Sequence, residues 1–491
     1  MKLKTLLSSL LHYSLNKDEN PEIDSIEMDS RRLQKNSLFI CIEGFTMDGH
    51  QFAKQAVQNG AVAILAEKEV DNAGVPVVIV NDTRRAMAIL SDSFYGHPTQ
   101  HMHLIGITGT NGKTTTSHII EKIVSDANVP SGLIGTIDMK IKGKSYKVAN
   151  TTPESLFLQK AFYQMKEEGV KTAVMEVSSH ALDQGRVRGC DFNIAVFTNL
   201  TQDHLDYHRN MDEYMYAKSL LFSQMGNVYK EGTMKAAVLN NDDQASTAFK
   251  RVTPSQILTY GIDNKSDIMA KDITINSRGT SFLLQVPGHE ERKVDLNLIG
   301  KFSVYNALAA ISACFLSGIA LDQIISSIES VRGVPGRFET VDAEQDFTVI
   351  VDYSHTPDSL ENVLRTIKEF ASGKITAIVG CGGDRDKSKR PIMAGIAVQL
   401  ADEAVFTSDN PRSEDPAAIL KDMEEGVDKD AEYRIIPDRK EAIEYAISNA
   451  KKDDIILIAG KGHETYQIIG SEVLDFDDRK VAMDAIGGIK K

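Results

Sequence analysis

The sequence lacks the features that mark several classes of protein. None of its apolar runs approaches the roughly 20 residues that a helix needs to cross a bilayer, so no membrane span is expected. The four cysteines are scattered, which argues against a structural zinc site or a disulfide framework and fits a reducing compartment. Basic residues are in deficit, and the net charge of −14 argues against non-specific nucleic-acid binding. Anionic small molecules remain possible ligands where cations and backbone N–H groups gather locally.

The first residues superficially resemble a signal peptide. Serines interrupt the apolar residues of segment 1–11, however, and segment 12–18 turns polar without a cleavage site. We therefore expect a short amphipathic helix at the start of a cytoplasmic protein.

The chain of 491 residues is too long for a single core, and its pattern divides it into three segments. We predict α/β domains at 1–98, 99–332 and 333–491, with the second boundary at the glycine- and proline-containing stretch 332–337. Short apolar runs that read as buried strands alternate with helix-like stretches throughout. The runs lie at 37–42, 61–65, 75–80, 103–108, 172–177, 194–200, 236–240, 347–353, 375–380, 403–407 and 455–459.

Polar residues follow the strand candidates of the second and third segments directly. In parallel α/β sheets, ligands bind beyond the carboxyl ends of the strands. The clearest sign of a ligand site is the segment Gly109-Thr110-Asn111-Gly112-Lys113-Thr114, which lies between a predicted strand and a predicted helix. Its glycines free backbone N–H groups for phosphate oxygens, its lysine neutralises the β- and γ-phosphates, and the Thr114 hydroxyl suits Mg²⁺. The general P-loop pattern requires glycine where this chain has Ile107.

Two further residues at predicted strand ends are candidate metal ligands. Glu176 ends an apolar strand, where a carboxylate is costly unless it is paired or bound to a metal. Beside a P-loop, Mg²⁺ is its natural partner, and a buried ion pair is the alternative. His204 follows another strand, where a structural role and a metal or substrate role are about equally supported.

Composition alone favours an ordinary role for Lys218 and leaves the arginines of the last segment undecided between ordinary and functional roles. Lys218 lies in a largely apolar helical stretch, which favours a surface lysine whose stem packs on the core. Arg385 and Arg412 follow strands and suit a substrate that carries carboxylates, although surface salt bridges would explain them equally well. Glu464 suits an ammonium group, or it is simply exposed to solvent.

Taken together, these motifs resemble those of the Mur ligase family over essentially the whole chain. The family's own P-loop has the form Gly-Thr-Asn-Gly-Lys-Thr, which explains the departure at Ile107. The other matching segments lie in the family's order along the chain, at 150–153, 176–180, 199–208, 300–306, 336–339, 352–357 and 459–464. The resemblance implies three domains: a small N-terminal α/β domain, a central P-loop ATPase-like domain with a parallel sheet, and a C-terminal Rossmann-like domain.

The implied activity is an ATP-dependent amide ligase of cytoplasmic peptidoglycan precursor synthesis. It would join meso-2,6-diaminopimelate to UDP-N-acetylmuramoyl-L-alanyl-D-glutamate through an acyl phosphate. The first domain would hold the UDP end of that substrate, the central domain ATP, and the last domain the amino acid. The positions that match family contacts to the UDP-linked substrate are Ser30, Asn150, Thr151, Thr152, Ser178, Gln184 and Arg186. Those that match contacts to ATP are Gly109, Thr110, Asn111, Gly112, Lys113, Thr114, Thr115, Asn306, Arg337, Asp352 and His355.

The resemblance also assigns the remaining candidates. Lys218 matches a carbamylated lysine, which overturns the ordinary interpretation of that residue. The implied Mg²⁺ ligands are Thr114, Glu176, His204 and Lys218, and the last three join Lys113 as catalytic residues. The positions that match contacts to diaminopimelate are Arg385, Asp409, Asn410, Pro411, Arg412, Gly460 and Glu464.

Within this family Arg412 selects the acceptor, because lysine lacks the second carboxylate that this arginine would bind. An unpaired buried arginine would penalise lysine by about 3 to 5 kcal/mol. Two alternatives remain in the same reaction class: an L-lysine-adding ligase and a folylpolyglutamate-type ligase. Another class is a P-loop switch or binding module that cycles ATP without ligation. We expect a monomer, and a hinge near residue 332 that lets the last domain close over the site.

Overall fold

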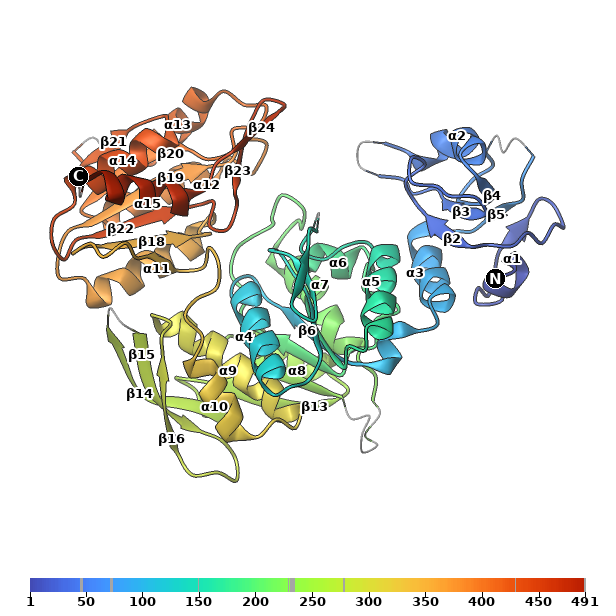
Figure 1. The fold of residues 1–491 in the computed structure, drawn as a ribbon, viewed down its shortest axis with the longest axis horizontal. Coiled ribbons are helices and arrows are strands. Elements are labelled where there is room, and N and C mark those ends of the chain that lie inside the picture. Colours follow the sequence, from blue (N-terminus) through green and yellow to red (C-terminus); the bar gives the residue numbers. More distant parts are fainter. Residues whose placement is uncertain are drawn as a thin grey trace.

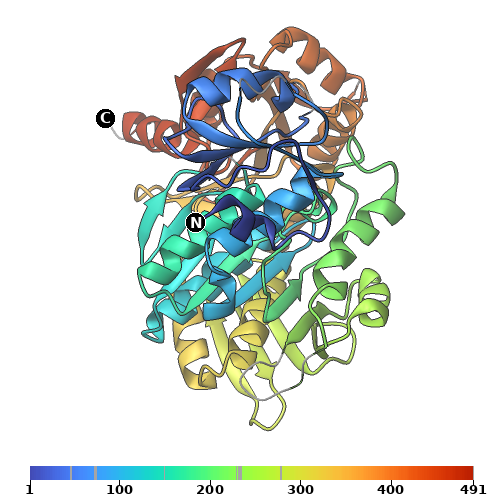
Figure 2. The same ribbon diagram turned by 90° about the vertical axis from the view of Figure 1, so that its right-hand side faces the viewer.

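The computed structural model describes residues 1–44, 47–70, 74–148, 150–227, 229, 235–276, 279–428 and 430–489. Three bodies follow one another along the chain, each built around its own β-sheet (Figure 1). The central body lies between the other two in that view, and Figure 2 shows the same arrangement from the side of the first body. The expected α/β class is confirmed, whereas the domain boundaries at 98 and 332 stay predictions.

The first body has a five-stranded sheet in the order β1-β5-β4-β3-β2. Its strands are parallel except for β1, which pairs antiparallel with β5. The strands are β1 (Ser14–Leu15), β2 (Ser25–Glu27), β3 (Ser37–Ile40), β4 (Ala61–Ala66) and β5 (Val77–Ile79). The helices are α1 (Leu3–Leu7), η1 (Gly49–Phe52), α2 (Ala53–Gln58) and α3 (Thr83–Phe94). The amphipathic N-terminal helix is confirmed as α1, which buries all three of its leucines.

The central sheet has eleven strands in the order β16-β15-β14-β13-β12-β11-β6-β10-β7-β8-β9. They are β6 (His103–Thr108), β7 (Ser131–Ile134), β8 (Met139–Ile141), β9 (Lys144–Tyr146), β10 (Thr172–Glu176), β11 (Ile194–Phe197), β12 (Ala236–Asn240), β13 (Gln256–Gly261), β14 (Ile268–Asn276), β15 (Gly279–Gln285) and β16 (Arg292–Leu296). From β7 to β14 the order is parallel, as predicted. This confirms the predicted parallel sheet, and antiparallel strands extend it at both ends. Buried and exposed residues alternate in parts of β14, which is typical of a sheet with one solvated face.

Helices cover the central sheet and connect its strands. They are η2 (Pro98–His101), α4 (Lys113–Asp126), α5 (Ser155–Glu167), α6 (Ser179–Asp183), α7 (Met211–Ser223), α8 (Ala245–Val252), α9 (Lys301–Leu316) and α10 (Leu321–Glu329). Helix α9 packs on α4 and is buried along most of its length, because nearly every residue from Ser303 to Cys314 is small or apolar. Helix α4 packs on the sheet as well, so that it contacts both the strands and α9.

The third sheet has six strands in the order β17-β18-β22-β19-β20-β21, parallel except for β17. They are β17 (Glu339–Val341), β18 (Thr348–Asp352), β19 (Ile375–Cys381), β20 (Glu403–Ser408), β21 (Tyr433–Ile435) and β22 (Ile455–Ala459). A separate hairpin follows, made of β23 (Tyr466–Ile469) and β24 (Glu472–Asp475). The helices are α11 (Pro357–Phe370), α12 (Lys389–Leu400), α13 (Pro416–Glu424), α14 (Arg439–Asn449) and α15 (Asp478–Ile489).

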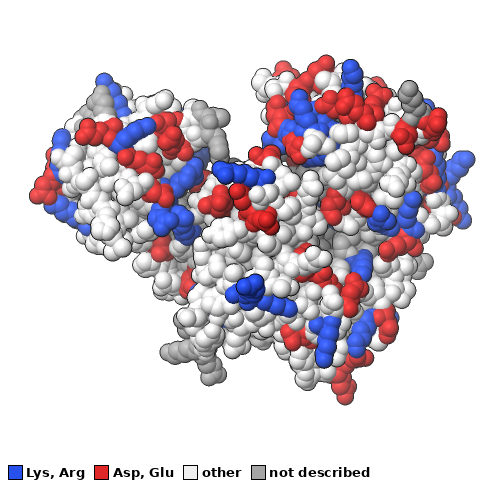
Figure 3. Space-filling view, turned by 180° about the vertical axis from the view of Figure 1, so that it is seen from behind, with Lys and Arg blue, Asp and Glu red and all other residues white. Residues whose placement is uncertain are grey.

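The surface carries acidic and basic side chains side by side. On the face seen from behind, neither sign forms a continuous field, and a notch separates the first body from the third (Figure 3). Among the described residues, none of the helices combines the length and apolarity that a membrane crossing requires.

Candidate functional site

The glycine loop joins β6 to α4 and lies against the end of the neighbouring strand β11. Gly109 and Gly112 have φ values of 152° and 85°, which side chains rarely adopt. A Cβ on Gly109 would lie 1.9 Å from the Thr198 hydroxyl, and one on Gly112 would lie 2.3 Å from the Asn306 side-chain oxygen. Both positions therefore require glycine for space as well as for backbone conformation. This also brings the predicted nucleotide contact Asn306 to the loop.

Lys113 bends back over the loop that precedes it. Its Nζ donates to the carbonyl oxygens of Gly109 (2.8 Å) and Thr110 (2.7 Å). Desolvation lowers the pKa of Lys113, although the nearby Glu176 carboxylate acts in the opposite direction. The amine is thus held by neutral carbonyl groups at the place where an anionic phosphate would give it a stronger partner.

Glu176 lies fully buried at the end of β10 and is surrounded by hydroxyl groups. Its carboxylate accepts from the hydroxyls of Thr114 and Thr136, each at 2.9 Å, and from the Thr136 N–H at 2.9 Å. The ion-pair alternative for this residue is therefore wrong: among the described residues, the carboxylate's hydrogen bonds come from hydroxyl and amide groups. A carboxylate and a threonine hydroxyl are the oxygen ligands that suit Mg²⁺.

His204 lies in the loop after β11 with a left-handed φ of 55°. Its ring packs edge-on against His180 at 4.8 Å between centroids, and its Nε2 lies 3.3 Å from the Asp203 carboxylate. Burial lowers the pKa of His204 to about 3, so the imidazole is neutral at physiological pH and retains a lone pair. Across the described residues, no three His, Cys, Asp or Glu side chains come together as a preformed metal site.

Lys218 is buried on α7, with only 1% of its surface exposed. Its Nζ donates to the Gly109 carbonyl at 2.8 Å and lies 4.5 Å from the centre of the Tyr214 ring. The surface position that composition favoured is therefore wrong: the side chain runs inward beneath the glycine loop. Burial, reinforced by the Lys113 charge, lowers the pKa of Lys218 far below its ordinary value.

The third body contacts the glycine loop directly. Arg337 donates through Nη2 to the Thr114 hydroxyl at 3.3 Å, and its guanidinium lies 4.3 Å from the centre of the Tyr353 ring. Asp352 ends β18 and accepts from the Phe338 N–H at 2.7 Å. His355 follows and donates from Nδ1 to the Tyr353 carbonyl at 2.8 Å. The predicted nucleotide residues of the two bodies thus face each other. Thr115 completes the set as the third residue of α4.

Most of the residues predicted to hold the UDP-linked substrate gather beside Glu176. The Thr152 hydroxyl donates to the Glu176 carbonyl (2.9 Å), and Arg186 donates to the Thr152 carbonyl (3.0 Å) and to the Gln184 side chain (2.7 Å through Nη2). Three others adjoin this group: the Thr151 hydroxyl, 3.0 Å from that of Thr136; the Ser178 N–H, 3.0 Å from the Thr152 hydroxyl; and the exposed Asn150.

Ser30 lies apart from that group, buried in the first body. Its carbonyl accepts from the Asn59 side chain at 2.8 Å, and among the described residues it makes no contact with the other predicted substrate residues. A link between the bodies comes instead from Arg84 of α3, which pairs with Glu154 at 3.1 Å.

The predicted amino-acid residues meet at the carboxyl ends of β20 and β22. The Asn410 side chain donates to Glu464 at 2.8 Å, and Lys461 donates to the Asn410 oxygen at 3.0 Å and approaches Glu464 at 3.3 Å. A Cβ on Gly460 would lie 2.7 Å from the Asp409 carboxylate. The Glu464 side chain is only 14% exposed, so the solvent-exposed alternative for it is wrong.

The two arginines approach this group from adjacent loops. Arg412 donates through Nη1 to the Gly383 carbonyl at 2.9 Å, and it follows Pro411, whose carbonyl lies against Gly383. Arg385 is exposed and donates to the Asp384 carbonyl at 2.9 Å. A Cβ on Gly382 would lie within 4 Å of both arginines, so the two loops bring them close to the same glycine. In neither case is the described contact a surface salt bridge.

Sequence reasoning missed three residues that the structure brings into these groups. Lys461 has no exposed side-chain surface and bonds to two predicted acceptor residues. Asp358, in the first turn of α11, accepts from the Asn111 side chain (2.7 Å) and from the Thr201 hydroxyl (3.0 Å). Tyr214 bonds to the Thr110 hydroxyl at 3.1 Å. Lys461 could have been found from its position between two glycines after a strand, whereas the sequence carries no signal for the partners of Asp358 and Tyr214.

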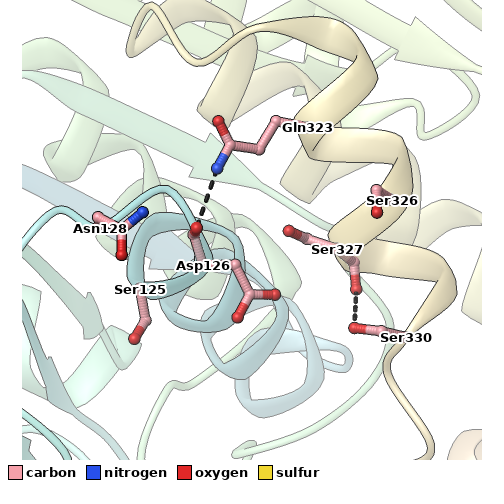
Figure 4. A pocket seen from close by; sticks show the side chains of 7 residues that line it. All are labelled: Ser125, Asp126, Asn128, Gln323, Ser326, Ser327 and Ser330. Atoms are coloured by element: carbon pink, nitrogen blue, oxygen red, sulfur yellow. Dashed lines mark hydrogen bonds between the residues drawn. The ribbon is translucent and has the colours of Figure 1, made fainter.

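A shallow polar cavity of about 550 Å³ lies elsewhere, between the C-terminal end of α4 and helix α10 (Figure 4). Gln323 of α10 donates there to the Asp126 carbonyl at 2.9 Å. Helix α4 has 14 residues and is therefore about 20 Å long, so this cavity lies at the end of the helix opposite the glycine loop. It takes no part in the site described above.

Family models match most of the chain. Residues 22–95 match the model described as "Mur ligase family, catalytic domain", 107–314 the Mur ligase middle domain, and 336–462 the model "Mur ligase, glutamate ligase domain".

Described relatives match over nearly the full length. A protein of Bacillus cereus named UDP-N-acetylmuramoyl-L-alanyl-D-glutamate--2,6-diaminopimelate ligase is 59% identical, with 99% of both chains covered. A protein of the same name from Geobacillus thermodenitrificans is 58% identical over 99% of both chains. A solved structure with that name is 34% identical, covers 96% of both chains and has a TM-score of 0.68. The Thermotoga maritima MurF ligase in complex with ADP, at 18% identity and a TM-score of 0.66, shares the fold over 95% of this chain and 96% of its own.

Proposed function

The chain belongs to the Mur ligase family of ATP-dependent ligases, and from that premise we propose that it joins meso-2,6-diaminopimelate to UDP-N-acetylmuramoyl-L-alanyl-D-glutamate. The observation that carries the proposal is the pairing of two groups of residues. The glycine loop with Lys113 lies between Arg337 and the predicted substrate residues around Thr152. The body that supplies Arg337 also carries Asn410, Lys461 and Glu464, with Arg412 beside them. One group suits phosphoryl transfer to a carboxylate, and the other suits an amino acid.

The reaction divides into two steps. The γ-carboxylate of D-glutamate attacks the γ-phosphorus of ATP, the bond to the β-phosphate oxygen breaks, and ADP leaves. In the structure the Lys113 amine donates to the carbonyl groups of Gly109 and Thr110. During the reaction it turns to the transferring phosphoryl oxygens and offsets their charge. The amine of diaminopimelate then attacks the acyl carbon, inorganic phosphate departs with its oxygen, and the amine loses a proton.

Acyl phosphates hydrolyse readily, so the site must exclude water during the second step. The contacts from Arg337 to Thr114 and from Asp358 to Asn111 support closure of the third body over the loop, with a hinge near residue 332. Positional isotope exchange within ATP, measured without the amine, tests the intermediate. Its absence would contradict the two-step course.

Mg²⁺ is the metal that the residues fit, because the fully buried Glu176 carboxylate and the Thr114 hydroxyl, both oxygen ligands, lie 2.9 Å apart. Thr114, Glu176, His204 and carbamylated Lys218 would hold it. When bound, it supplies positive charge to the phosphate oxygens.

Carbamylation of Lys218 is part of the proposal. A neutral amine adds to CO₂ and releases one proton, and the suppressed pKa of Lys218 supports that neutral form. ¹³C NMR of the protein under labelled bicarbonate should give one carbamate signal that is absent from Lys218→Gln. If the spectra of the two proteins are identical, the modification does not occur.

The acceptor is tested by competition. We expect ADP release and amide product with diaminopimelate and far less with lysine or glutamate, because Arg412 offers a partner only to the distal carboxylate. Product formed preferentially from lysine or glutamate would establish one of the alternative ligases. ATP turnover without any product would establish a switch. The proposal includes a monomeric protein located in the cytoplasm, where this precursor synthesis takes place.

A further inference from the structure

Two neighbouring loops of the third body are interlocked, namely the first acceptor loop (residues 382–386, after β19) and the second acceptor loop (residues 409–414, after β20). The Gly383 N–H donates to the Asn410 carbonyl at 2.9 Å, and Arg412 donates back to the Gly383 carbonyl at 2.9 Å. A Cβ on Gly383 would lie 1.9 Å from the Pro411 carbonyl oxygen, so no larger residue fits there. Arg385 and Arg412 therefore take their places from a single joint structure.

Each loop contains a non-glycine residue in the left-handed region, a conformation that persists only where surrounding contacts fix it. They are Asp384, with a φ of 54°, and Arg412, with a φ of 53°. The backbone of Arg412 is held by the β23–β24 hairpin, through bonds with Ile468 (3.1 Å) and Gly470 (2.7 Å). Asp384 is held from the second loop, since its carboxylate accepts from the Ser413 hydroxyl at 2.6 Å.

Glu414 is the side chain that joins these loops to the body beneath them. Its Oε1 accepts from the Asp384 N–H (2.6 Å) and from Arg390 Nη2 (2.9 Å), and its Oε2 accepts from Arg390 Nη1 (3.0 Å). Lys387 Nζ also lies 3.2 Å from Oε2. Both carboxylate oxygens are thus surrounded by donors.

Arg390 is fully buried at the start of α12, and a second carboxylate holds it from the other side. Its Nη1 donates to Asp422 of α13 at 2.7 Å, and its Nη2 approaches the Gly382 carbonyl at 3.3 Å. Glu414 therefore connects a rigid buried cation to the backbone of the first acceptor loop. Asp422 pairs with the same cation, but none of its described contacts reaches either loop.

We propose that Glu414 and Arg390 are positioning residues for the acceptor amino acid, because they fix the spacing between Arg385 and Arg412. They would act without contacting the substrate, by locking the two acceptor loops in the arrangement that presents both guanidinium groups to its carboxylates. The inference rests on the proposed function and adds specificity determinants that lie beneath the binding residues. The positioning role requires both carboxylate oxygens of Glu414, because the two Arg390 nitrogens and the Asp384 N–H donate to them.

The test compares two isosteric variants of the full-length protein. In Glu414→Gln an NH₂ group must face a donor, so the loops shift, and the KM for diaminopimelate should rise on the order of 10- to 100-fold, as for an ångström-scale misplacement. The kcat and the KM for ATP should stay within about 2-fold, because the P-loop is untouched. In Asp422→Asn an oxygen still accepts from Arg390, and all three constants should match those of the unchanged protein.

Two outcomes would overturn the positioning role: an unchanged KM for diaminopimelate in Glu414→Gln, or an equal rise in Asp422→Asn. If Glu414→Gln does not fold, Ser413→Ala decides instead. It removes only the exposed bond to Asp384 and should raise the same KM by roughly 2- to 5-fold, in keeping with one modest hydrogen bond; no rise would refute the proposal. If the protein without any substitution is inactive with diaminopimelate, the proposed function itself is contradicted.

Discussion

The glycine loop and the acceptor loops handle charge in opposite ways. Around the glycine loop, burial suppresses the charges: it lowers the pKa of Lys113, that of Lys218 much further, and that of His204 to about 3. In the acceptor loops the charges persist because they are paired. The Arg390 guanidinium and the Asp384 N–H together lower the pKa of Glu414 to about 2.

Under the proposed function, the contrast follows from what each site would receive. A triphosphate and a divalent cation bring their own charges, so a loop whose amines rest on neutral carbonyl groups gains strong partners only when they bind. The acceptor amino acid must instead be distinguished from close analogues, which requires charged groups at fixed spacing before it arrives. The first site is completed by its ligands, whereas the second is organised in advance.

The largest expected effect comes from breaking the ligand-completed site at Lys113. Lys113→Met should lower kcat on the order of 10³-fold, the scale for removing a donor that acts on transition-state charge. The folded structure should be retained, because only bonds to two carbonyl groups are lost. Steady-state ADP release measures the effect. Lys122→Met, on the exposed side of the same helix, is the matched control and should retain full activity. A kcat within 10-fold of the original would show that Lys113 does not act on the phosphoryl group.

Arg412→Ala breaks the organised site. We expect kcat/KM for diaminopimelate to fall roughly 10²-fold, as when a charge-assisted bidentate contact is lost, while the value for lysine changes little. The ratio of the two acceptors, measured in one competition assay, is therefore the sharper readout. Arg434→Ala removes an exposed arginine from the edge strand of the same sheet and should leave the ratio unchanged. An unaltered ratio in Arg412→Ala would remove this residue from the acceptor site.

Acid should destabilise the protein through His118, a histidine of α4, the helix that follows the glycine loop. Burial lowers the pKa of His118, on α4, from 6.5 to about 3. Because the folded pKa is depressed, the stabilisation is present above pH 6.5 and is lost as the pH falls towards 3. Between pH 7.5 and 5.5 this one group should cost about 1.4 kcal/mol, a loss that His118→Gln should avoid. Chemical denaturation at both pH values measures the difference. The exposed His12→Gln should behave as the unchanged protein, and equal pH dependence in His118→Gln would refute the assignment.

The sequence predicted the fold where periodicity is strong. β12 and β22 have the predicted bounds, and β18 differs by one residue at each end. The antiparallel strands β14 to β16 escaped prediction because their exposed faces break the continuous apolar runs that mark buried strands. Likewise, only the family resemblance argued against a surface position for Lys218. Its helix α7 has apolar residues on most sides, so the sequence pattern does not indicate whether the lysine points inward or outward.

Partners that come from distant segments could not be predicted in the same way. Glu464 looked equally well suited to solvent until the structure placed Lys461 and Asn410 around it. Glu414 and Arg390 carry no motif of their own, and their importance appears only once α12 and the two acceptor loops lie together. Residue types at strand ends are therefore readable from the sequence, but the side chains that orient them are set by packing.

The smallest expected effect tests whether the two sites are coupled through Asp358. Its carboxylate is the acceptor for both Asn111 and Thr201, so it connects the body that carries the acceptor loops to the glycine loop. Asp358→Ala should lower the free energy of unfolding by only about 1 kcal/mol or less, because each lost bond is partly replaced by water. The unliganded Asp358→Ala protein should nevertheless show a larger radius of gyration in small-angle scattering. Both bonds go to the same oxygen, Oδ2, so Asp358→Asn can keep them and should retain the original radius. An unchanged radius in Asp358→Ala would mean that the other contacts between these bodies, among them Arg337 with Thr114 and Phe302 with Phe338, suffice to hold them together. In that case the two sites would be coupled through the contact of Arg337 with Thr114 rather than through the contact of Asp358 with Asn111.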